Sequence, residues 1–293
     1  PTPSVRELAR LGANELGRIP VLEWHDVAET DDRWGTSRAT FRRQLQELYD
    51  RGYRPVTAAE FARGEFPVAA GRTPVVFTLD DSFRSHLWFG SDGRPHPDSV
   101  VGILEAFAKD KPEWRATAAF YIYWPVPFRE RDQIDRKLRY LVDNGYELGN
   151  HSFNHDDLSK LDPDGVRESL ARAQAAVQER IPGYRMATLA LPFGLWPPDK
   201  SVAVTGQWEG TRYWHDAVFL VGDMPYHPPH HARYDPWHVM RVQSYEFRKW
   251  IDWLDAEPGR RFVSDGDPAT VAYPSRLQEV AKVRPGFQAV PYD

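Results

Sequence analysis

Apolar, β-branched runs alternate with segments of helical periodicity along most of this 293-residue chain. The runs that predict strands cover residues 19–25, 73–81, 117–123, 147–152, 187–194, 217–222 and 238–243. Between them, apolar residues recur at helical spacing, as in Phe41, Leu45 and Leu48, and again within residues 134–142 and 166–177. This alternation is typical of a parallel sheet wrapped by helices. We therefore expect an α/β fold in which the strands form one barrel.

The same pattern predicts how the chain is divided. We expect a single domain over residues 1–293, with the barrel at about residues 19–255. Beyond Trp253 the periodicity is weak and prolines are frequent, which predicts a partly ordered tail that packs on the barrel. Stretches rich in Pro and Gly at residues 91–98, 197–210 and 225–236 predict long loops. In a β/α barrel, the loops that follow the strands build the active site.

Composition and charge exclude several classes of function. The 37 basic and 42 acidic residues give a net charge of −5, which leaves no basic surface to attract nucleic acid. No run approaches the roughly 18 apolar residues that a membrane span needs. The chain starts at Pro1 and not at Met, so we expect that a leader has been removed. It contains no Cys, so any metal must be bound by His, Asp, Glu or water.

Residues 75–79 form an apolar run that ends abruptly in two adjacent carboxylates, Asp80 and Asp81. Neighbouring residues of a strand point to opposite sides, so the pair does not easily share one role. A division into one metal ligand and one base fits this geometry. A strand-end cap with a salt-bridge partner is an equally favoured interpretation of this segment alone.

Two histidines, His151 and His155, follow the strand-like residues 147–150. A spacing of four places them on one face if a helical turn begins there, where they can offer two imidazoles to one metal ion. The pair is a weak signal alone, because structural or exposed histidines are commoner. Joined with the acidic strand end, two imidazoles and one carboxylate leave positions open for water and substrate, which is typical of a catalytic metal site.

A third strand end breaks into a turn at Pro192, Phe193 and Gly194. Such a turn frees backbone N–H groups, one of which can point at a developing oxyanion. An ordinary strand-to-loop turn is the favoured interpretation of this segment alone.

Taken in order, these segments resemble the polysaccharide deacetylase family, also called the NodB homology family or carbohydrate esterase family 4. Residues 77–82, FTLDDS, look like its T-F-D-D-G motif, and residues 145–155, GYELGNHSFNH, closely match G-h-E-i-G-N-H-S/T-x-x-H. Residues 191–194, LPFG, look like the end of R-x-P-F/Y-G, and residues 20–26, PVLEWHD, resemble the opening strand P-V-L-x-Y-H. The resemblance runs from about residue 19 to 243. It implies a deformed (β/α) barrel and a hydrolase that removes acetyl groups from amino sugars of a polysaccharide.

The resemblance also implies roles for individual residues. It assigns three ligands to one divalent metal ion, usually zinc: Asp81, His151 and His155. Asp80 is then the general base that takes the proton of the attacking water. The metal and the Phe193 N–H stabilise the oxyanion, and Pro192 belongs to the same substrate-binding turn.

The general acid departs from the family pattern. Many members carry it in a late L-x-L-H-D motif, and no His follows Gln243 in this chain. The candidates are His25 on the opening strand, or His227, His230 and His231 in a Pro-rich loop. We favour His25, because its Trp-His-Asp setting resembles biofilm-matrix deacetylases in which the opening-strand His is implicated, and we keep His230 as the alternative acid. A buried structural role for His25 is an equally favoured interpretation.

Two further positions differ from the motifs. Ala190 stands where many members have an Arg that orients the base. Ser82 replaces the motif Gly, and we expect its side chain to narrow the metal pocket or to block a substrate.

We therefore expect a metal-dependent deacetylase that removes N-acetyl, or alternatively O-acetyl, groups from an extracellular or cell-wall glycan, and that is located outside the cell or in its envelope. An acetyl xylan esterase and a carbohydrate-binding pseudoenzyme that keeps the metal site are the alternatives. The expected partner is a polysaccharide or oligosaccharide and not a nucleic acid, with no membrane span, and the oligomeric state is left open.

Overall fold

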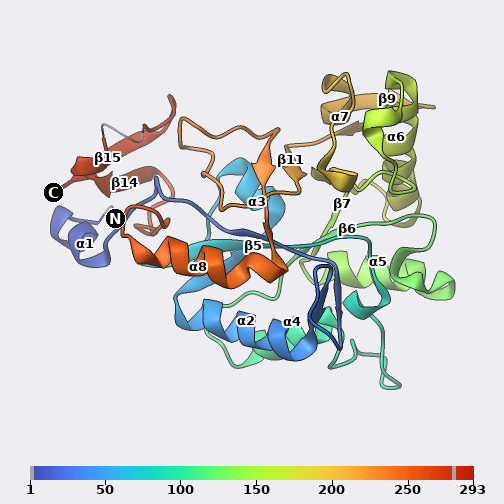
Figure 1. The fold of residues 1–293 in the computed structure, drawn as a ribbon, viewed down its shortest axis with the longest axis horizontal. Coiled ribbons are helices and arrows are strands. Elements are labelled where there is room, and N and C mark those ends of the chain that lie inside the picture. The colour runs from blue at the N-terminus through green and yellow to red at the C-terminus, as the bar shows by residue number, and fades with distance from the viewer. Residues whose placement is uncertain (1–2, 279–281) are drawn as a thin grey trace.

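A parallel sheet of six strands lies at the centre of the computed structural model, which describes residues 3–278 and 282–293 (Figure 1). Five strands follow in the order β13 (Val242–Gln243), β1 (Val21–Trp24), β5 (Thr73–Leu79), β6 (Ala119–Tyr121) and β7 (Glu147–Gly149), and β4 (Tyr53–Val56) pairs with residues 73–76 of β5. Every pair in this sheet is parallel, as the alternating sequence pattern predicts.

A second parallel sheet continues the curve of the first. It contains β12 (Val239–Met240), β11 (Ala217–Leu220) and β8 (Thr188–Ala190). A single bridge between Asn150 and Leu189 joins it to the end of β7. At the other side β12 leads into β13 across one residue, Arg241, which belongs to neither strand. The two sheets therefore form one barrel with irregular joints, and the predicted deformed (β/α) barrel is confirmed.

Helices cover the outside of this barrel. They are α2 (Arg38–Asp50), α3 (Ala58–Arg63), α4 (Val100–Lys109), α5 (Ile134–Asp143), α6 (Pro163–Arg180) and α8 (Phe247–Ala256). Figure 1 shows α2, α4 and α5 along one side of the large sheet. The three segments of predicted helical periodicity lie in α2, α5 and α6 and bury their apolar residues. Among the described residues, no helix has the length and apolar character of a membrane span.

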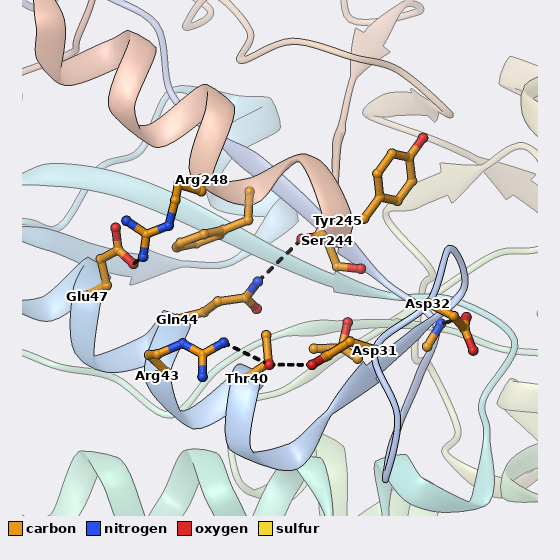
Figure 2. Close-up of a pocket in the computed structure, with 12 residues that line it drawn as sticks. Asp31, Asp32, Thr40, Arg43, Gln44, Glu47, Ser244, Tyr245 and Arg248 are labelled. Atoms are coloured by element: carbon orange, nitrogen blue, oxygen red, sulfur yellow. Dashed lines mark hydrogen bonds and ion pairs between the residues drawn. The ribbon is translucent and has the colours of Figure 1, made fainter.

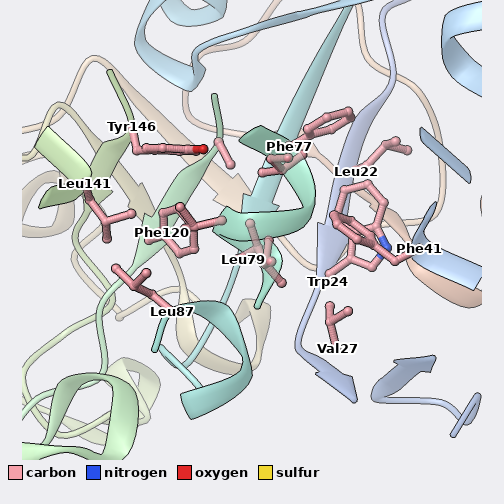
Figure 3. Close-up of a cluster of buried hydrophobic side chains, with 14 of the residues drawn as sticks. Leu22, Trp24, Val27, Phe41, Phe77, Leu79, Leu87, Phe120, Leu141 and Tyr146 are labelled. Atoms are coloured by element: carbon pink, nitrogen blue, oxygen red, sulfur yellow. The ribbon is translucent and has the colours of Figure 1, made fainter. Parts of the chain in front are cut away.

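The large sheet separates two sets of side chains with a period of two. Leu22 and Trp24 of β1, with Phe77 of β5, pack on the helix side (Figure 3). Glu23 and Thr78, one position away, point into the barrel, because neighbouring strand residues face opposite sides. This alternation places polar groups inside the barrel at the carboxyl ends of β1 and β5.

The loop predicted at residues 197–210 is partly wrong. The segment contains the short helix α7 (Ser201–Val204) and the strand β9 (Thr205–Trp208), which pairs antiparallel with β10 (Thr211–Trp214). Glu209 and Gly210, both at positive φ, form the turn of this hairpin. The hairpin is mostly exposed, so its sequence lacks the apolar pattern that reveals a buried strand.

The chain beyond α8 has more regular structure than a partly ordered tail. It contains the parallel strands β14 (Thr270–Pro274) and β15 (Gln288–Tyr292), next to the N-terminal helix α1 (Val5–Leu11). Glu15, which follows α1, accepts a hydrogen bond from the backbone N–H of Ala272 at 2.9 Å. The two end segments of the chain therefore pack on each other.

Candidate metal centre and active site

Asp81, His151 and His155 come together at the carboxyl ends of β5 and β7. One ligand atom from each lies within 4.8 Å of the other two. The Nε2 atoms of His151 and His155 lie 3.5 Å and 3.4 Å from Oδ1 of Asp81. Two imidazoles and one carboxylate are the donor set of many catalytic zinc sites.

The ring of His151 is held in a defined orientation. Its Nδ1 lies 2.7 Å from the backbone carbonyl oxygen of Ala190, which can only accept a hydrogen bond. Nδ1 therefore carries the proton, and Nε2 presents its lone pair towards Asp81 and His155. An oriented, buried imidazole of this kind is what a metal ligand requires, so the three residues fit a divalent ion.

The backbone around these ligands is in an unusual conformation. Asp81, Ser82, Ser152, His155 and Phe193 account for five of the nine described non-glycine residues at positive φ. This conformation costs free energy for residues with a Cβ and tends to concentrate at functional sites. The predicted helical turn at His151 is wrong: residues 151–157 form an irregular loop, in which the positive φ of Ser152 and His155 brings the second imidazole back to the first.

Asp80 is bound by an arginine that the sequence interpretation missed. The two terminal nitrogens of Arg241 donate to the two carboxylate oxygens of Asp80, both at 2.8 Å. Nε of Arg241 lies 3.4 Å from Oε2 of Glu23, and the guanidinium is fully buried. The only signal in the sequence is a charged residue inside the apolar run at residues 238–243. A buried cation requires buried carboxylates as partners, but nothing along the chain says which ones.

Charges in this cluster set the protonation of its members. Burial alone would raise the pKa of Asp80, but Arg241 and His151 outweigh it and hold that pKa below the usual range. Burial raises the pKa of Glu23, against the attraction of Arg241. Burial would lower the pKa of His151, but the Asp81 and Asp80 carboxylates raise it overall. Asp80 is therefore a carboxylate, the form that can accept a proton.

His25 lies in the same pocket as these groups. A cavity of about 390 Å³ is lined by His25, Trp34, Asp80, Asp81, Phe83, His151, His155, Leu191, Phe193 and Val221. Nδ1 of His25 is 3.8 Å from Oε1 of Glu23, and its ring meets the ring of Trp34 edge-on with 5.1 Å between centroids. We call this cavity the catalytic pocket. His25, the base candidate Asp80 and the metal-site residues line this one cavity, where a single small ligand can reach all of them.

The other acid candidates lie elsewhere. Nε2 of His230 is hydrogen-bonded to the carbonyl oxygen of Glu15, and its ring packs on Phe66 and Phe262. The rings of His227 and His231 stack on each other with centroids 3.9 Å apart. None of these three histidines lines the catalytic pocket.

The turn at residues 192–194 forms one wall of the pocket. Phe193 is 59% exposed, and its ring meets the ring of His155 at 4.6 Å between centroids. Pro192 is buried at the start of the turn and is not among the residues that line the pocket.

Ser82 does not narrow the pocket. Its side chain is fully buried, and its Oγ accepts a hydrogen bond from the backbone N–H of Tyr123 at 3.0 Å. The expectation that Ser82 intrudes on the metal site is therefore wrong. Ala190 is also fully buried. It contributes to the site through its backbone carbonyl oxygen, which accepts the hydrogen bond from Nδ1 of His151, and not through its side chain.

Comparison with known proteins agrees with this geometry. Residues 73–208 match the family model for polysaccharide deacetylase. This segment belongs to the polysaccharide deacetylase family. It contains all three residues of the metal-site cluster and the base candidate Asp80.

Proteins similar to part of this chain include two chitooligosaccharide deacetylases. The protein from Rhizobium leguminosarum bv. phaseoli is 28% identical over 117 residues, which cover 40% of this chain and 48% of that protein. The protein from Bradyrhizobium sp. is 25% identical over 120 residues, which cover 41% of this chain and 51% of that protein. The chain thus matches only about half the length of these curated relatives.

Solved structures of other proteins share the fold. The Streptococcus pyogenes deacetylase PplD, in complex with acetate, superposes with a TM-score of 0.58 at 16% identity, covering 77% of this chain and 92% of that one. IcaB from Ammonifex degensii superposes with a TM-score of 0.53 at 19% identity, covering 81% of this chain and 97% of that one.

Proposed function

We propose that this chain is a metal-dependent hydrolase that removes N-acetyl groups from a polysaccharide. One observation carries the proposal: the Asp81, His151 and His155 cluster shares its pocket with a buried carboxylate, Asp80, and with an imidazole, His25. Hydrolysis of an amide needs a base for the attacking water and an acid for the leaving amine. The catalytic pocket offers one candidate for each.

The metal site would be held by Asp81, His151 and His155, and we propose zinc as the ion. When bound, it would supply Lewis acidity at the acetyl carbonyl. Asp80 would accept the proton of the attacking water, and Arg241 keeps its carboxylate ionised and oriented. His25 would donate a proton to the departing amine. The Phe193 N–H would stabilise negative charge on the acetyl oxygen, with Pro192 fixing the turn.

The structure favours an enzyme over a carbohydrate-binding pseudoenzyme. Three departures from the family motifs favour a pseudoenzyme: Ala190, Ser82 and the missing late His. The fold answers each of them. Arg241 orients the base from the β12–β13 joint, although Ala190 has replaced the usual Arg. Ser82 faces away from the pocket, and His25 lies inside it although the late His is missing.

The wider assignment follows from this reaction. We propose a polysaccharide or oligosaccharide substrate, a single catalytic domain over residues 1–293, and a location outside the cell or in its envelope. The chitooligosaccharide deacetylases among the relatives support an N-acetylated substrate over acetylated xylan.

The test is release of acetate from chitooligosaccharides, peptidoglycan fragments and acetylated xylan, with and without a chelator. We expect release from the N-acetylated substrates, loss of release on chelation and recovery when zinc is added back. Binding of these sugars without any release would support the pseudoenzyme. Release that survives complete removal of metal would overturn the proposed mechanism.

A further inference from the structure

A second cavity lies beside the catalytic pocket, on the far side of the turn that carries Trp34. It has a volume of about 390 Å³. It is lined by Asp31, Asp32, Gly35, Thr36, Thr40, Arg43, Gln44, Glu47, Ser244, Tyr245, Phe247 and Arg248 (Figure 2). We call it the outer cavity. Asp32 and Gly35 line the outer cavity while Trp34, between them in the chain, lines the catalytic pocket, so one short turn forms a wall of both.

That shared turn is rigidly built. Oδ1 of Asp32 accepts hydrogen bonds from the backbone N–H groups of Trp34 and Gly35, at 2.8 and 2.7 Å. Asp31 accepts from the backbone N–H of Ser37 at 2.7 Å, next to the start of α2. These two carboxylates are thus occupied in holding the turn. A wall with fixed geometry loses little conformational entropy when a ligand binds against it.

The opposite wall is also anchored. It is formed by the short helix η6 (Ser244–Glu246) that directly follows β13. Nε2 of Gln44 donates to the Ser244 carbonyl oxygen at 3.3 Å, while Oε1 of Gln44 accepts from the buried Trp24 ring at 3.1 Å. Figure 2 shows Tyr245 and Arg248 on the α8 side of the cavity and Arg43 on the α2 side.

The chemistry of the walls fits neutral sugars. Tyr245 in the outer cavity is 53% exposed, and Trp34 on the catalytic-pocket side of the shared turn is 49% exposed. Such exposure is unusual for large rings and suits the apolar faces of pyranoses. Arg43 donates to Thr40 at 2.9 Å, and a guanidinium has further N–H donors for hydroxyl groups. Asp31, Asp32 and Glu47 lie among the two arginines, a mixture that disfavours a strongly anionic ligand.

We propose that the outer cavity is a subsite for the sugar units that flank the reacting one, reached over the Trp34 turn. The inference rests on the proposed function and deepens it, because it makes the substrate an oligomer long enough to occupy both cavities. Tyr245 would stack on a ring of the chain, and Arg43 would hydrogen-bond its hydroxyl groups. A substrate of only one or two sugar units would occupy the catalytic pocket and leave the outer cavity empty.

The test compares kcat/KM for the N-acetylglucosamine hexasaccharide with that for the disaccharide. We expect the native protein to prefer the hexasaccharide, and Tyr245→Ala to lower the ratio about three- to tenfold, the usual effect of one aromatic contact. Arg43→Gln, on the opposite wall, should lower the same ratio. Trp214→Ala removes an equally exposed ring on β10 and should leave the ratio at its native value.

Calorimetric binding of both sugars to the Asp80→Asn protein gives a readout without turnover. Tighter binding of the hexasaccharide, reduced by Tyr245→Ala, supports the subsite. Turnover of both sugars with a ratio that neither wall variant changes would overturn the subsite alone. If neither sugar is bound or deacetylated, the proposed function and the subsite are both overturned.

Discussion

Arg241 binds both carboxylate oxygens of Asp80 at 2.8 Å, and this contact joins a residue at the β12–β13 joint to the end of β5. The guanidinium also lies beside Glu23 of β1, so one buried cation serves two buried carboxylates. Removing one partner from such a group leaves uncompensated charge in the interior. The proposed active-site base and the stability of the barrel therefore depend on the same side chain.

Arg241→Lys should separate the role of Arg241 in orienting Asp80 from its role in stabilising the barrel. A lysine keeps the positive charge but cannot bind both oxygens of Asp80 in the planar arrangement of a guanidinium. We expect kcat to fall roughly 100-fold, because small misplacement of a catalytic group has effects of that order. Steady-state kinetics of acetate release measure this.

Arg241→Met goes further and removes the charge itself. We expect a loss of about 3–5 kcal/mol in the free energy of unfolding, as for other broken buried ion pairs. Urea denaturation measures it, with the exposed Arg172→Met on α6 as a control that should cost much less. Equal losses in the two variants would show that the buried cation does not stabilise the barrel.

The proposed base Asp80 and the proposed metal ligand His155 should behave differently when altered. Asp80→Asn removes a base but no proposed ligand, so we expect acetate release to fall about 10²- to 10⁴-fold with metal content unchanged. His155→Ala removes a proposed ligand and should lower the metal content itself. Elemental analysis of the purified proteins distinguishes the two. Similar loss of metal in both variants would reverse the roles assigned to Asp80 and Asp81.

The general acid can be tested by comparing two histidines. His25→Ala should lower kcat about 10²- to 10⁴-fold, because it removes an imidazole from the catalytic pocket. His230→Ala should lower the melting temperature instead, since His230 packs against Phe66 and Phe262 and bonds to Glu15. Full activity in His25→Ala would remove that residue from the mechanism.

Stability should depend on pH through Glu15, between the two end segments. Burial raises the pKa of Glu15 to about 8, assisted by the nearby charge of Asp265. Between its ordinary value near 4.5 and 8, the folded protein keeps this proton while the unfolded chain loses it, so rising pH lowers stability across that window. Each pH unit costs at most about 1.4 kcal/mol.

Glu15→Gln cannot ionise, so it should lose stability less steeply than the native protein from pH 5 to pH 8. Urea unfolding at several pH values in this interval measures the two slopes. Parallel slopes would show that Glu15 does not retain its proton in the folded state.

The sequence predicted the parts of the fold that follow from periodicity and the parts of the site that lie in contiguous motifs. All seven predicted strands contain observed ones, and the cluster of Asp81, His151 and His155 forms as expected. Arg241 was missed because its partners are distant in the chain. Ser82 was misjudged because the direction of a side chain after a strand depends on φ, which is +40° here. The exposed β9–β10 hairpin was missed because it lacks a buried face.

The strand order has a consequence for how the protein is made. β1 pairs with β13, and Asp80 meets an arginine that is 161 residues further along the chain. During synthesis on the ribosome, β1 and β5 emerge long before β13 and Arg241. Until residue 241 is available, Glu23 and Asp80 lack the guanidinium that offsets most of the cost of their burial, which disfavours early closure of the sheet around them. Folding dominated by such non-local contacts is slow. The proposed catalytic machinery is therefore completed only after residue 241 has been translated.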